Sequence, residues 1–364
     1  MGWALLGAGL LLALYTLLRH GLRRAPPPRS RPALRGRTAI VTGERWAPPR
    51  RLPVPARPPR SPLRALLRSA GGSGGIGAAT ALELARCGAR VVLAARSAPR
   101  GEATARRIRT VSAAVPETGN AEVLFMQLDL ASLRSVRAFA KAFLRQEPHL
   151  HLLINNAGER VSAGGTTEDG FSLPFQVNHL GHFLLTQLLL ERLQSCAPSR
   201  VVIVASRAHC AGRLHPDTLG RPPPGPLSTF QDYCDSKLAN VLHARELATR
   251  LQGTQVTCYA VHPGFVNTEL FRHAPLWLKP LFLPLAWLFF LDAAEGAQTS
   301  LHCATHEGLE RFSGRYFADC RLQEPWPPAR DDRLARALWE ASERLVGLGG
   351  PEGSPSPAPA AVLQ

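Results

Sequence analysis

A tyrosine and a lysine four residues apart carry the clearest signal of chemistry in this sequence. Tyr233 and Lys237 stand in the segment YCDSK. If the segment is helical, both side chains lie on one face, and the ammonium group can stabilise the phenolate and lower the pKa of the tyrosine. Such a phenol can exchange a proton with a carbonyl or alcohol oxygen while a hydride moves at the carbon. The spacing alone is weak evidence, because it occurs by chance in many chains.

Polar residues at the ends of two apolar runs strengthen this interpretation. Ser206 ends the run VVIVAS, and the segment NNAG at 155–158 follows the run LLI. If these runs are strands of a parallel sheet, both ends lie at the carboxyl edge, where such sheets bind ligands. Ser206 can then hydrogen-bond a substrate carbonyl, although a serine in this position is often only a turn residue. Asn178 lies early in the helix expected after NNAG.

Strand-like and helix-like segments alternate from residue 37 onward. Short apolar runs predict strands at 38–41, 90–93, 123–127, 150–154, 200–205 and 255–261. Segments of helical spacing or length lie at 76–87, 100–110, 133–144, 175–194 and 233–251. The alternation predicts an α/β fold, a doubly wound parallel sheet of the Rossmann type with helices on both faces. We expect it to form a single domain over residues 37–346.

Several motifs resemble, in the same order, those of the short-chain dehydrogenase/reductase superfamily. They are TG at 42–43, GIG at 75–77, Asp129 in LDL, NNAG at 155–158, Asn178, Ser206, YCDSK at 233–237 and HPGFVNT at 262–268. The segments ARSAPRGE, LANVL and HCAGRL resemble the retinol-dehydrogenase branch. The resemblance covers residues 37–318 and implies a nicotinamide-dependent oxidoreductase.

The resemblance also implies a role for each catalytic residue. It places Asn178 in a water relay and Ser206 on the substrate carbonyl. Tyr233 would act as the acid or base, and Lys237 would bind the nicotinamide ribose.

Further residues are implied to bind the cofactor. Asp129 would lie near adenine, Asn155 near the adenosine ribose and Thr268 near the nicotinamide amide. The remaining implied contacts are Thr42, Gly43, Gly75, Ile76, Gly77 and Ala157, together with Tyr233 and Lys237. No metal site is expected.

The end of the second predicted strand indicates which cofactor is used. Superfamily members that prefer NAD carry an acid there, which accepts a bond from the free 2′-hydroxyl, whereas this chain has Ala95 followed by Arg96. A guanidinium can pair with the 2′-phosphate of NADP(H). We therefore predict NADP(H). The simpler alternative is a solvated arginine in a chain rich in arginine.

The glycine-rich cofactor loop is interrupted. The superfamily pattern TGxxxGIG has three residues where this chain has 31 between Gly43 and Gly75, and the extra segment at 44–71 contains seven Pro and seven Arg. It is either a real insertion or the product of a retained intron. Closing the longer loop costs only about 2 kcal/mol, so the fold should survive. The longer loop is more harmful to the binding of the cofactor phosphates, because it removes the tight turn at Gly43. The alternative function is therefore a catalytically impaired pseudo-enzyme or a binding protein.

The N-terminal segment predicts a membrane anchor. Residues 2–18 are uncharged and rich in Leu and Ala, and Arg19, Arg23 and Arg24 follow. We interpret 1–18 as a transmembrane helix and 19–36 as a basic, proline-rich linker, with the catalytic domain facing the cytosol from the endoplasmic reticulum. A cleaved signal peptide, and hence secretion, is the alternative. The tail at 347–364 is expected to be disordered.

Charge and cysteine content exclude other classes of protein. The net charge of +16 comes mostly from two segments, 19–37 with +7 and 44–71 with +6. The rest of the chain carries only +3, which argues against a basic surface for binding nucleic acid. The seven cysteines are scattered without a CxxC pair, which is typical of neither a disulfide framework nor a zinc site.

A second apolar segment indicates the class of substrate. Residues 275–291, PLWLKPLFLPLAWLFFL, stand where the superfamily carries its substrate lid. Such a lid, together with the anchor, predicts a lipophilic, retinoid-like alcohol or its aldehyde or ketone. A second transmembrane helix is the alternative, which Lys279 and two prolines weaken. The sequence does not indicate the oligomeric state.

Overall fold

The computed structural model describes residues 33–43, 75–113, 122–159, 165–225, 228–264 and 293–348. In this part of the chain, eight strands form one sheet in the order β3-β2-β1-β4-β5-β6-β7-β8. The strands are β1 (Thr38–Gly43), β2 (Arg90–Ala95), β3 (Val123–Gln127), β4 (Leu152–Asn155), β5 (Ser199–Val204), β6 (Val256–His262), β7 (Tyr316–Ala318) and β8 (Arg321–Gln323). The six predicted strands are confirmed, and β7 and β8 extend the sheet at one edge.

The helices lie between the strands, as the alternation predicts. Residues 75–86 are helical. The other helices are α3 (Ala98–Ala113), α4 (Leu133–Gln146), α5 (Leu173–Phe175), α6 (Gly181–Ser195), α7 (Ser228–Arg250), α9 (Ala293–Thr305) and α10 (Asp332–Leu345), with short 3-10 turns η3 (Arg207–Ala211), η4 (Pro216–Thr218), η5 (Glu310–Phe312) and η6 (Pro327–Arg330). The helix predicted to begin at residue 233 begins five residues earlier, at Ser228.

The order of the strands defines where a ligand can bind. Strands β1 to β7 are parallel, and β8 pairs antiparallel with β7. From β1 the chain winds outward to β3 and then returns to β4 on the other side of β1. Doubly wound sheets bind ligands in the crevice at the carboxyl ends of the two strands where this reversal occurs. Here these strands are β1 and β4.

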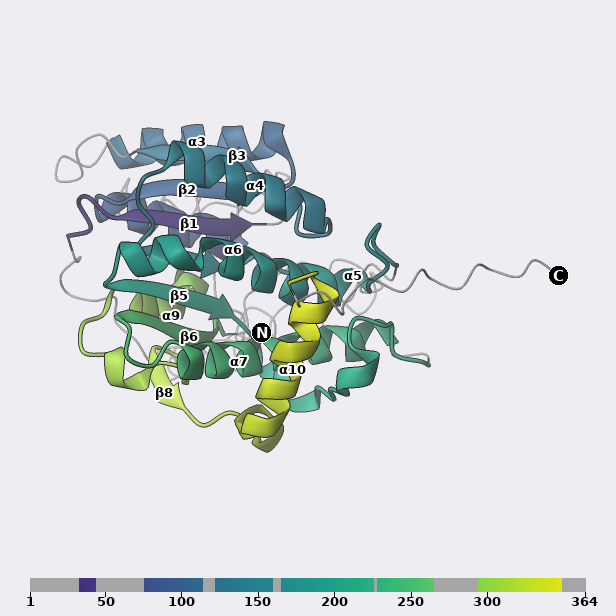
Figure 1. Cartoon of the computed structure of the whole chain (residues 1–364). Coiled ribbons are helices and arrows are strands. Elements are labelled where there is room, and N and C mark those ends of the chain that lie inside the picture. Colours follow the sequence, from purple (N-terminus) through teal and green to yellow (C-terminus); the bar gives the residue numbers. More distant parts are fainter. Residues whose placement is uncertain are drawn as a thin grey trace, which may run out of the picture.

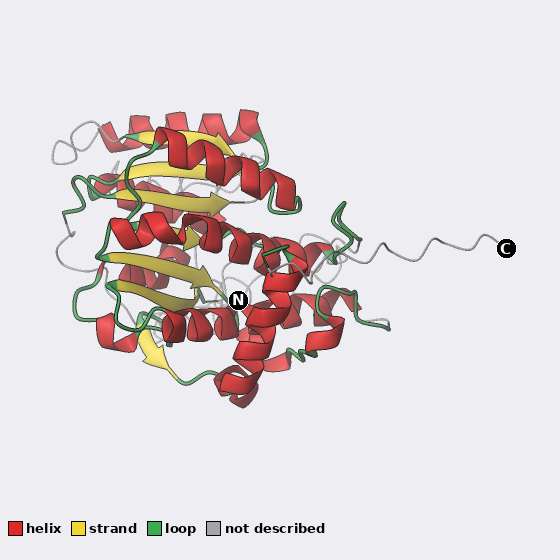
Figure 2. Cartoon of the chain, in the orientation of Figure 1, coloured by secondary structure: helices red, strands yellow, loops and turns green. Residues whose placement is uncertain are grey.

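Two hydrophobic layers enclose the sheet. Because successive strand residues point to opposite faces, Ile40 packs into one core while Ala39 and Val41 pack into the other. The first core contains α4, α6 and α7, and the second contains the helix at 75–86, α3 and α9. Figure 2 shows the strands as a layer between these helices. The predicted doubly wound Rossmann-type sheet is confirmed.

The helix predicted at 175–194 is interrupted by a wider turn. After α5, residues Gln176–Leu180 form a π-helix, η2, in which the N–H of Gly181 bonds to the carbonyl oxygen of Gln176. Such turns are rare and are frequent at functional sites. This one contains Asn178, the residue predicted for the water relay.

Helix α10 was not predicted from the sequence. It lies across the helices of the first layer, beside α7 (Figure 1). Its Trp339 ring packs edge-on against Phe183 of α6, with centroids 4.9 Å apart, and lies under the guanidinium of Arg250 at 4.4 Å. Through Trp339, the C-terminal region is part of the same core as helices α6 and α7.

Several predictions concern residues outside the described part. They include the anchor at 1–18, most of the linker, the insertion at 44–71, the apolar segment at 275–291, Thr268 and nearly all of the tail. None of the helices in the described ranges has the length and hydropathy needed to cross a bilayer.

Replacing Trp339 by alanine should lower the free energy of unfolding by about 3–5 kcal/mol, because it leaves a cavity between α6 and α7. Urea unfolding followed by circular dichroism measures the change. The matched control is Glu340→Ala, at an exposed neighbouring position of α10, which should change stability by less than about 0.5 kcal/mol. Equal stability of both variants would contradict the packing of α10.

Candidate active site

One hydroxyl group joins the carboxyl ends of β1 and β4. The Thr42 Oγ1 accepts the main-chain N–H groups of Asn156 and Ala157, each at 2.9 Å. The Asn156 side chain returns a bond, from Nδ2 to the carbonyl oxygen of Thr42, also at 2.9 Å. The turn after β4 is therefore fixed onto the end of β1, at the crevice where the sheet can bind a nucleotide.

His182, a buried residue of α6, completes the bonding of Thr42. Its Nδ1 lies 3.2 Å from the carbonyl oxygen of Asn178, which can only accept, so Nδ1 carries the proton. Its Nε2 then accepts the proton of the Thr42 hydroxyl over 2.8 Å. Burial in the first place, and also the charge of Lys237, lower the pKa of His182 to about 4. The imidazole is therefore neutral, as both bonds require.

Gly77 lets the helix at 75–86 approach this junction. A Cβ at this position would lie 2.5 Å from Nδ2 of Asn156 and 3.3 Å from the carbonyl oxygen of Thr42. A larger residue would displace the Asn156 amide from the carbonyl oxygen of Thr42 or move the start of the helix away from it. The last glycine of GIG thus has the close-packing role that nucleotide-binding turns require.

Asn178 uses every hydrogen-bonding group of its buried side chain. Its Nδ2 donates to Ser236 Oγ at 2.9 Å and to the carbonyl oxygen of Glu159 at 3.0 Å, and its Oδ1 accepts the N–H of Glu159 at 2.7 Å. Ser236 in turn donates to the carbonyl oxygen of Tyr233 at 2.7 Å. Asn178 therefore ties the segment after β4 to the turn of α7 that carries Tyr233.

Lys237 lies beside the ring of Tyr233 and is 4% exposed. Its Nζ is 5.6 Å from the centroid of that ring and donates to the carbonyl oxygen of Val204, the last residue of β5, at 3.2 Å. A Cβ on Gly158 would lie 3.4 Å from this Nζ and 3.4 Å from Asn178 Oδ1. The helical spacing therefore brings the phenol and the ammonium together, as predicted, at the carboxyl edge of the sheet.

Ser206 begins the turn that follows β5. Its backbone is extended, and its Oγ accepts the N–H of Ala208 at 3.2 Å, which leaves the hydroxyl proton available to a ligand. The turn η3 packs against α7. At the contact, a Cβ on Gly212 would lie 2.8 Å from the carbonyl oxygen of Cys234, the neighbour of Tyr233. Two elements in direct contact thus carry the predicted serine and tyrosine.

A narrow pocket opens over the crevice between β1 and β4. Its lining includes Gly43, Arg96, Asp129, Ala157 and Glu159. The first four were predicted as cofactor contacts, and the structure brings them together. Glu159 was not identified from the sequence.

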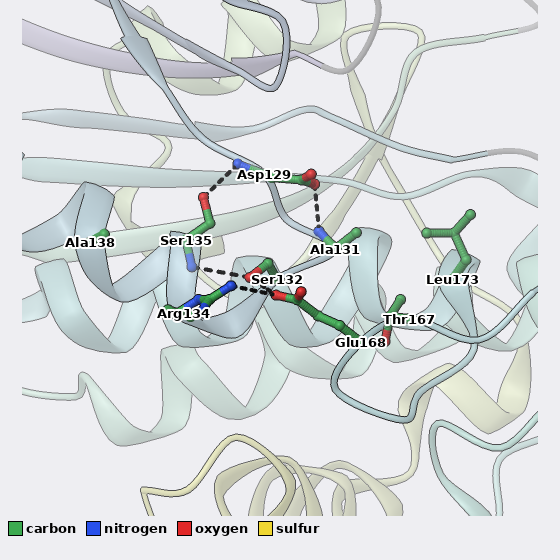
Figure 3. A pocket seen from close by; sticks show the side chains of 9 residues that line it. All are labelled: Asp129, Ala131, Ser132, Arg134, Ser135, Ala138, Thr167, Glu168 and Leu173. Carbon is green, nitrogen blue, oxygen red and sulfur yellow. Dashed lines mark hydrogen bonds and ion pairs between the residues drawn. The ribbon is translucent and has the colours of Figure 1, made fainter.

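Asp129 also borders an open hollow of about 620 Å³, shown in Figure 3. The first turn of α4 and the segment with Thr167 and Glu168 form its other walls. Oδ1 of Asp129 accepts the N–H of Ala131 at 3.0 Å, while its own N–H bonds to Ser135 Oγ at 3.0 Å. The carboxylate is thereby held where the hollow meets the narrow pocket, since Asp129 lines both.

The remaining predicted cofactor residues lie in different surroundings. The side chain of Asn155 is buried and donates to Thr186 Oγ1 at 2.9 Å, so a contact with the adenosine ribose would fall to its main chain. Gly75 and Ile76 open the helix at 75–86, and Gly75 has φ +69°, which favours glycine. Thr268 lies outside the described residues.

The sequence assigned no role to the buried histidines near the site, although His262 begins the motif HPGFVNT. Burial foremost lowers the pKa of His262 to about 4, and the charge of Lys237 contributes to this shift. Burial likewise lowers the pKa of His179 to about 3. The neutral rings of His182 and His262 lie close enough to Lys237 for its charge to lower their pKa values, and they add no positive charge there. For His182, its helical spacing of four residues from Asn178 is the signal that sequence analysis could have used.

Comparisons with known proteins agree with this geometry. A family model described as short chain dehydrogenase matches residues 69–217. Dehydrogenase/reductase SDR family member 13 of Homo sapiens is 54% identical over 357 residues, which cover 98% of this chain and 85% of that protein. The chain belongs to the short-chain dehydrogenase/reductase superfamily, in its retinol-dehydrogenase-like branch. Retinol dehydrogenase 12 of Homo sapiens is 51% identical over 289 residues, covering 76% of this chain and 85% of that protein.

A solved structure shows the same fold. An uncharacterised protein from Mycobacterium paratuberculosis superimposes with a TM-score of 0.63 at 32% identity, covering 87% of this chain and 95% of that one. The predicted superfamily and branch are confirmed. The match to the short-chain dehydrogenase model begins at residue 69, so the TG pair at 42–43 falls outside it.

The buried histidines make this short-chain dehydrogenase sensitive to acid. The unfolded chain protonates each of them near its ordinary pKa of 6.5, whereas the folded chain keeps His179 and His182 neutral until about pH 3 and 4. Between the folded-state pKa and 6.5, the unfolded state binds more protons than the folded state. The free energy of unfolding therefore decreases as the pH is lowered, by about 1.4 kcal/mol per pH unit for each such histidine. Asp232 acts in the opposite direction between pH 6 and 3.8, because burial raises its pKa from 3.8 to about 6.

His243 offers the cleanest test, because burial lowers its pKa well below 6.5 and neither ring nitrogen has a hydrogen-bond partner among the described residues. Between pH 6.5 and 5, His243→Leu should lose about 1.4 kcal/mol less stability per pH unit than the wild type. The control, His306→Gln at an exposed position of the segment after α9, should follow the wild type. Urea midpoints across this range measure the slopes, and three parallel lines would show that His243 is protonated in the folded state.

Proposed function

We propose that this protein is an NADP(H)-dependent oxidoreductase that interconverts a lipophilic alcohol and its aldehyde or ketone by hydride transfer. The observation that carries the proposal is the placement of Tyr233, Lys237 and Asn178 at the carboxyl edge of the sheet. The ammonium lies 5.6 Å from the centre of the phenol ring, and Asn178 is linked to the same turn through Ser236.

The residues over the crevice fit a dinucleotide. Gly43 and Ala157 present little side chain, Arg96 and Asp129 supply a cation and an acid, and all four line one pocket. Gly77 keeps the helix close enough for its N-terminus to approach a phosphate. The cofactor, when bound, supplies or accepts the hydride.

Side chains of the protein transfer the proton that accompanies the hydride. In the reduction direction the Ser206 hydroxyl donates a hydrogen bond to the substrate carbonyl oxygen, and Tyr233 transfers its phenolic proton to that oxygen. Lys237 stabilises the phenolate that remains, because its ammonium lies beside the ring. Because Lys237 and Tyr233 are positioned before substrate arrives, little reorganisation is needed during the reaction.

Arg96 supports the choice of NADP(H). It is exposed at the end of β2 and lines the pocket with Gly43 and Asp129, and its own carbonyl oxygen accepts a bond from Gln127 Nε2 at 3.2 Å. Ala95 provides no acceptor for a free 2′-hydroxyl. A 2′-phosphate at this point would gain a charge-assisted bond to the guanidinium.

The relatives and the apolar segments support a proposal for the substrate and the location. The matched retinol dehydrogenases, the segment 275–291 and the segment 1–18 support a retinoid-like substrate drawn from a membrane. We place the catalytic domain on the cytosolic side of the endoplasmic reticulum, anchored through residues 1–18, because arginines follow the apolar run.

Replacing Tyr233 by phenylalanine should lower kcat for NADPH-linked retinal reduction by about 10²–10⁴-fold, because the proton donor is lost. The assay follows NADPH absorbance with the full chain in detergent micelles. Tyr259→Phe removes the same atom from a buried tyrosine of β6 and should retain wild-type turnover. Undiminished turnover in Tyr233→Phe would refute the assigned acid.

A second arm compares the full chain with a chain that lacks residues 44–71. Activity only in the shortened chain would mean that the insertion blocks the phosphate site. No turnover and no NADPH protection against thermal unfolding in either chain would favour the binding-protein alternative.

Replacing Arg96 by alanine should raise the KM for NADPH by about tenfold or more, because a charge-assisted bond contributes about 1.5–3 kcal/mol. The KM for NADH should change little, since that cofactor has no 2′-phosphate. Arg106→Ala, at an exposed position of α3, is the charge-matched control. Equal changes in the KM values for NADPH and NADH would show that Arg96 does not bind the 2′-phosphate.

A further inference from the structure

His209 connects the turn of Ser206 to the C-terminal region. The residue is 2% exposed and lies in η3, three positions after Ser206. Its Nδ1 is 2.6 Å from the carbonyl oxygen of Ser206, and its Nε2 is 3.2 Å from the main-chain nitrogen of Trp326. Its ring packs edge-on against Tyr316 of β7, with centroids 5.0 Å apart. Three separate segments therefore meet at one imidazole.

The contacts of His209 with two main-chain groups fix the protonation state of its ring. A carbonyl oxygen can only accept, so Nδ1 of His209 carries a proton. The main-chain N–H of Trp326 can only donate, so Nε2 carries none. Burial foremost, and the nearby charge of Arg207, lower the pKa of His209 and agree with this neutral tautomer.

The bond to Ser206 constrains the direction of its side chain. The Ser206 carbonyl oxygen accepts both Nδ1 and the main-chain N–H of His209, the latter at 3.1 Å. Two donors on one oxygen fix the peptide plane that follows the Ser206 Cα. With Gly212 locking the same turn onto α7, the Ser206 hydroxyl has a defined position relative to Tyr233.

We propose that His209 is a positioning residue for Ser206, and that it couples the catalytic turn to the segment carrying Trp326. This inference rests on the proposed function, because it assigns His209 to the reaction through Ser206. The side chain of Trp326 is 54% exposed, so its main chain is anchored by the imidazole rather than by burial of the indole.

The two contacts can be separated by substitution. Asparagine reaches the position of Nδ1 and can donate to Ser206, whereas glutamine reaches the position of Nε2 and can accept from Trp326. His209→Asn should therefore keep kcat within about twofold of the wild type, while the Trp326 amide exchanges with solvent about tenfold faster. His209→Gln should keep the Trp326 amide protected but lower kcat by about tenfold or more, because small misplacements of catalytic groups are costly.

The experiment measures retinal reduction and amide hydrogen exchange on the full-length chain. His209→Ala removes both the contact with Ser206 and the contact with Trp326, and the exposed His306→Asn is the control. The KM for NADPH should stay unchanged in all variants, since none touches the cofactor pocket. Wild-type kcat in His209→Gln, or equal losses in the asparagine and alanine variants, would overturn the proposal.

The same measurements separate this inference from the proposed function. If the wild type turns over retinal and Tyr233→Phe does not, failure of the kinetic pattern refutes only the role of His209. If the wild type shows no turnover, the proposed function fails, and hydrogen exchange alone decides the coupling. Unchanged protection of Trp326 in His209→Asn would then refute it.

Discussion

The arrangement of the active site depends on the hydrogen bonding of Asn178. Its amide has two protons and one oxygen, and all are used, toward Glu159 and Ser236. In a buried setting an unmade bond costs about 1–3 kcal/mol, so the amide has one low-energy orientation. That orientation sets the distance between the π-turn η2 and helix α7. The place of Tyr233 and Lys237 over the sheet follows from it.

The histidines near Asn178 are neutral, so His182 can hydrogen-bond to Asn178 beside the buried ammonium of Lys237. His182 bridges Asn178 and Thr42 by donating with one nitrogen and accepting with the other, an arrangement that only an uncharged ring can make. A protonated ring there would place a second positive charge near Lys237, and both burial and that charge oppose it. The same rings that orient the site therefore add no positive charge to that of the Lys237 ammonium, which lies beside the Tyr233 ring.

The sequence predicted the sheet and the proximity of Tyr233 and Lys237 because each depends on local periodicity. Apolar runs become strands, and the spacing from Tyr233 to Lys237 becomes one helix face. Strand β7 was missed because it is only three residues long. Helix α10 did carry a local signal, since its buried residues recur at helical spacing, but its packing of Trp339 on Phe183 could not be read from the sequence. His182 and His209 were missed for a related reason. Their long-range partners, Thr42 and Trp326, lie 140 and 117 positions away, and the spacing of His182 from Asn178 was the one local signal for either residue.

The contacts on both sides of residues 44–74 place β1 and the helix at 75–86 independently of the length of the segment between them. On one side β1 stays in register with β2 and β4 through Gly43 and Val41, and on the other Gly77 packs against Asn156 and Thr42. Contacts on both flanks define where strand and helix meet, and closure entropy grows only slowly with loop length. Binding of a nucleotide phosphate depends more strongly on the loop than folding does, because the phosphate needs backbone N–H groups at a fixed distance from the start of the helix. An insertion here therefore acts on cofactor affinity before it acts on folding.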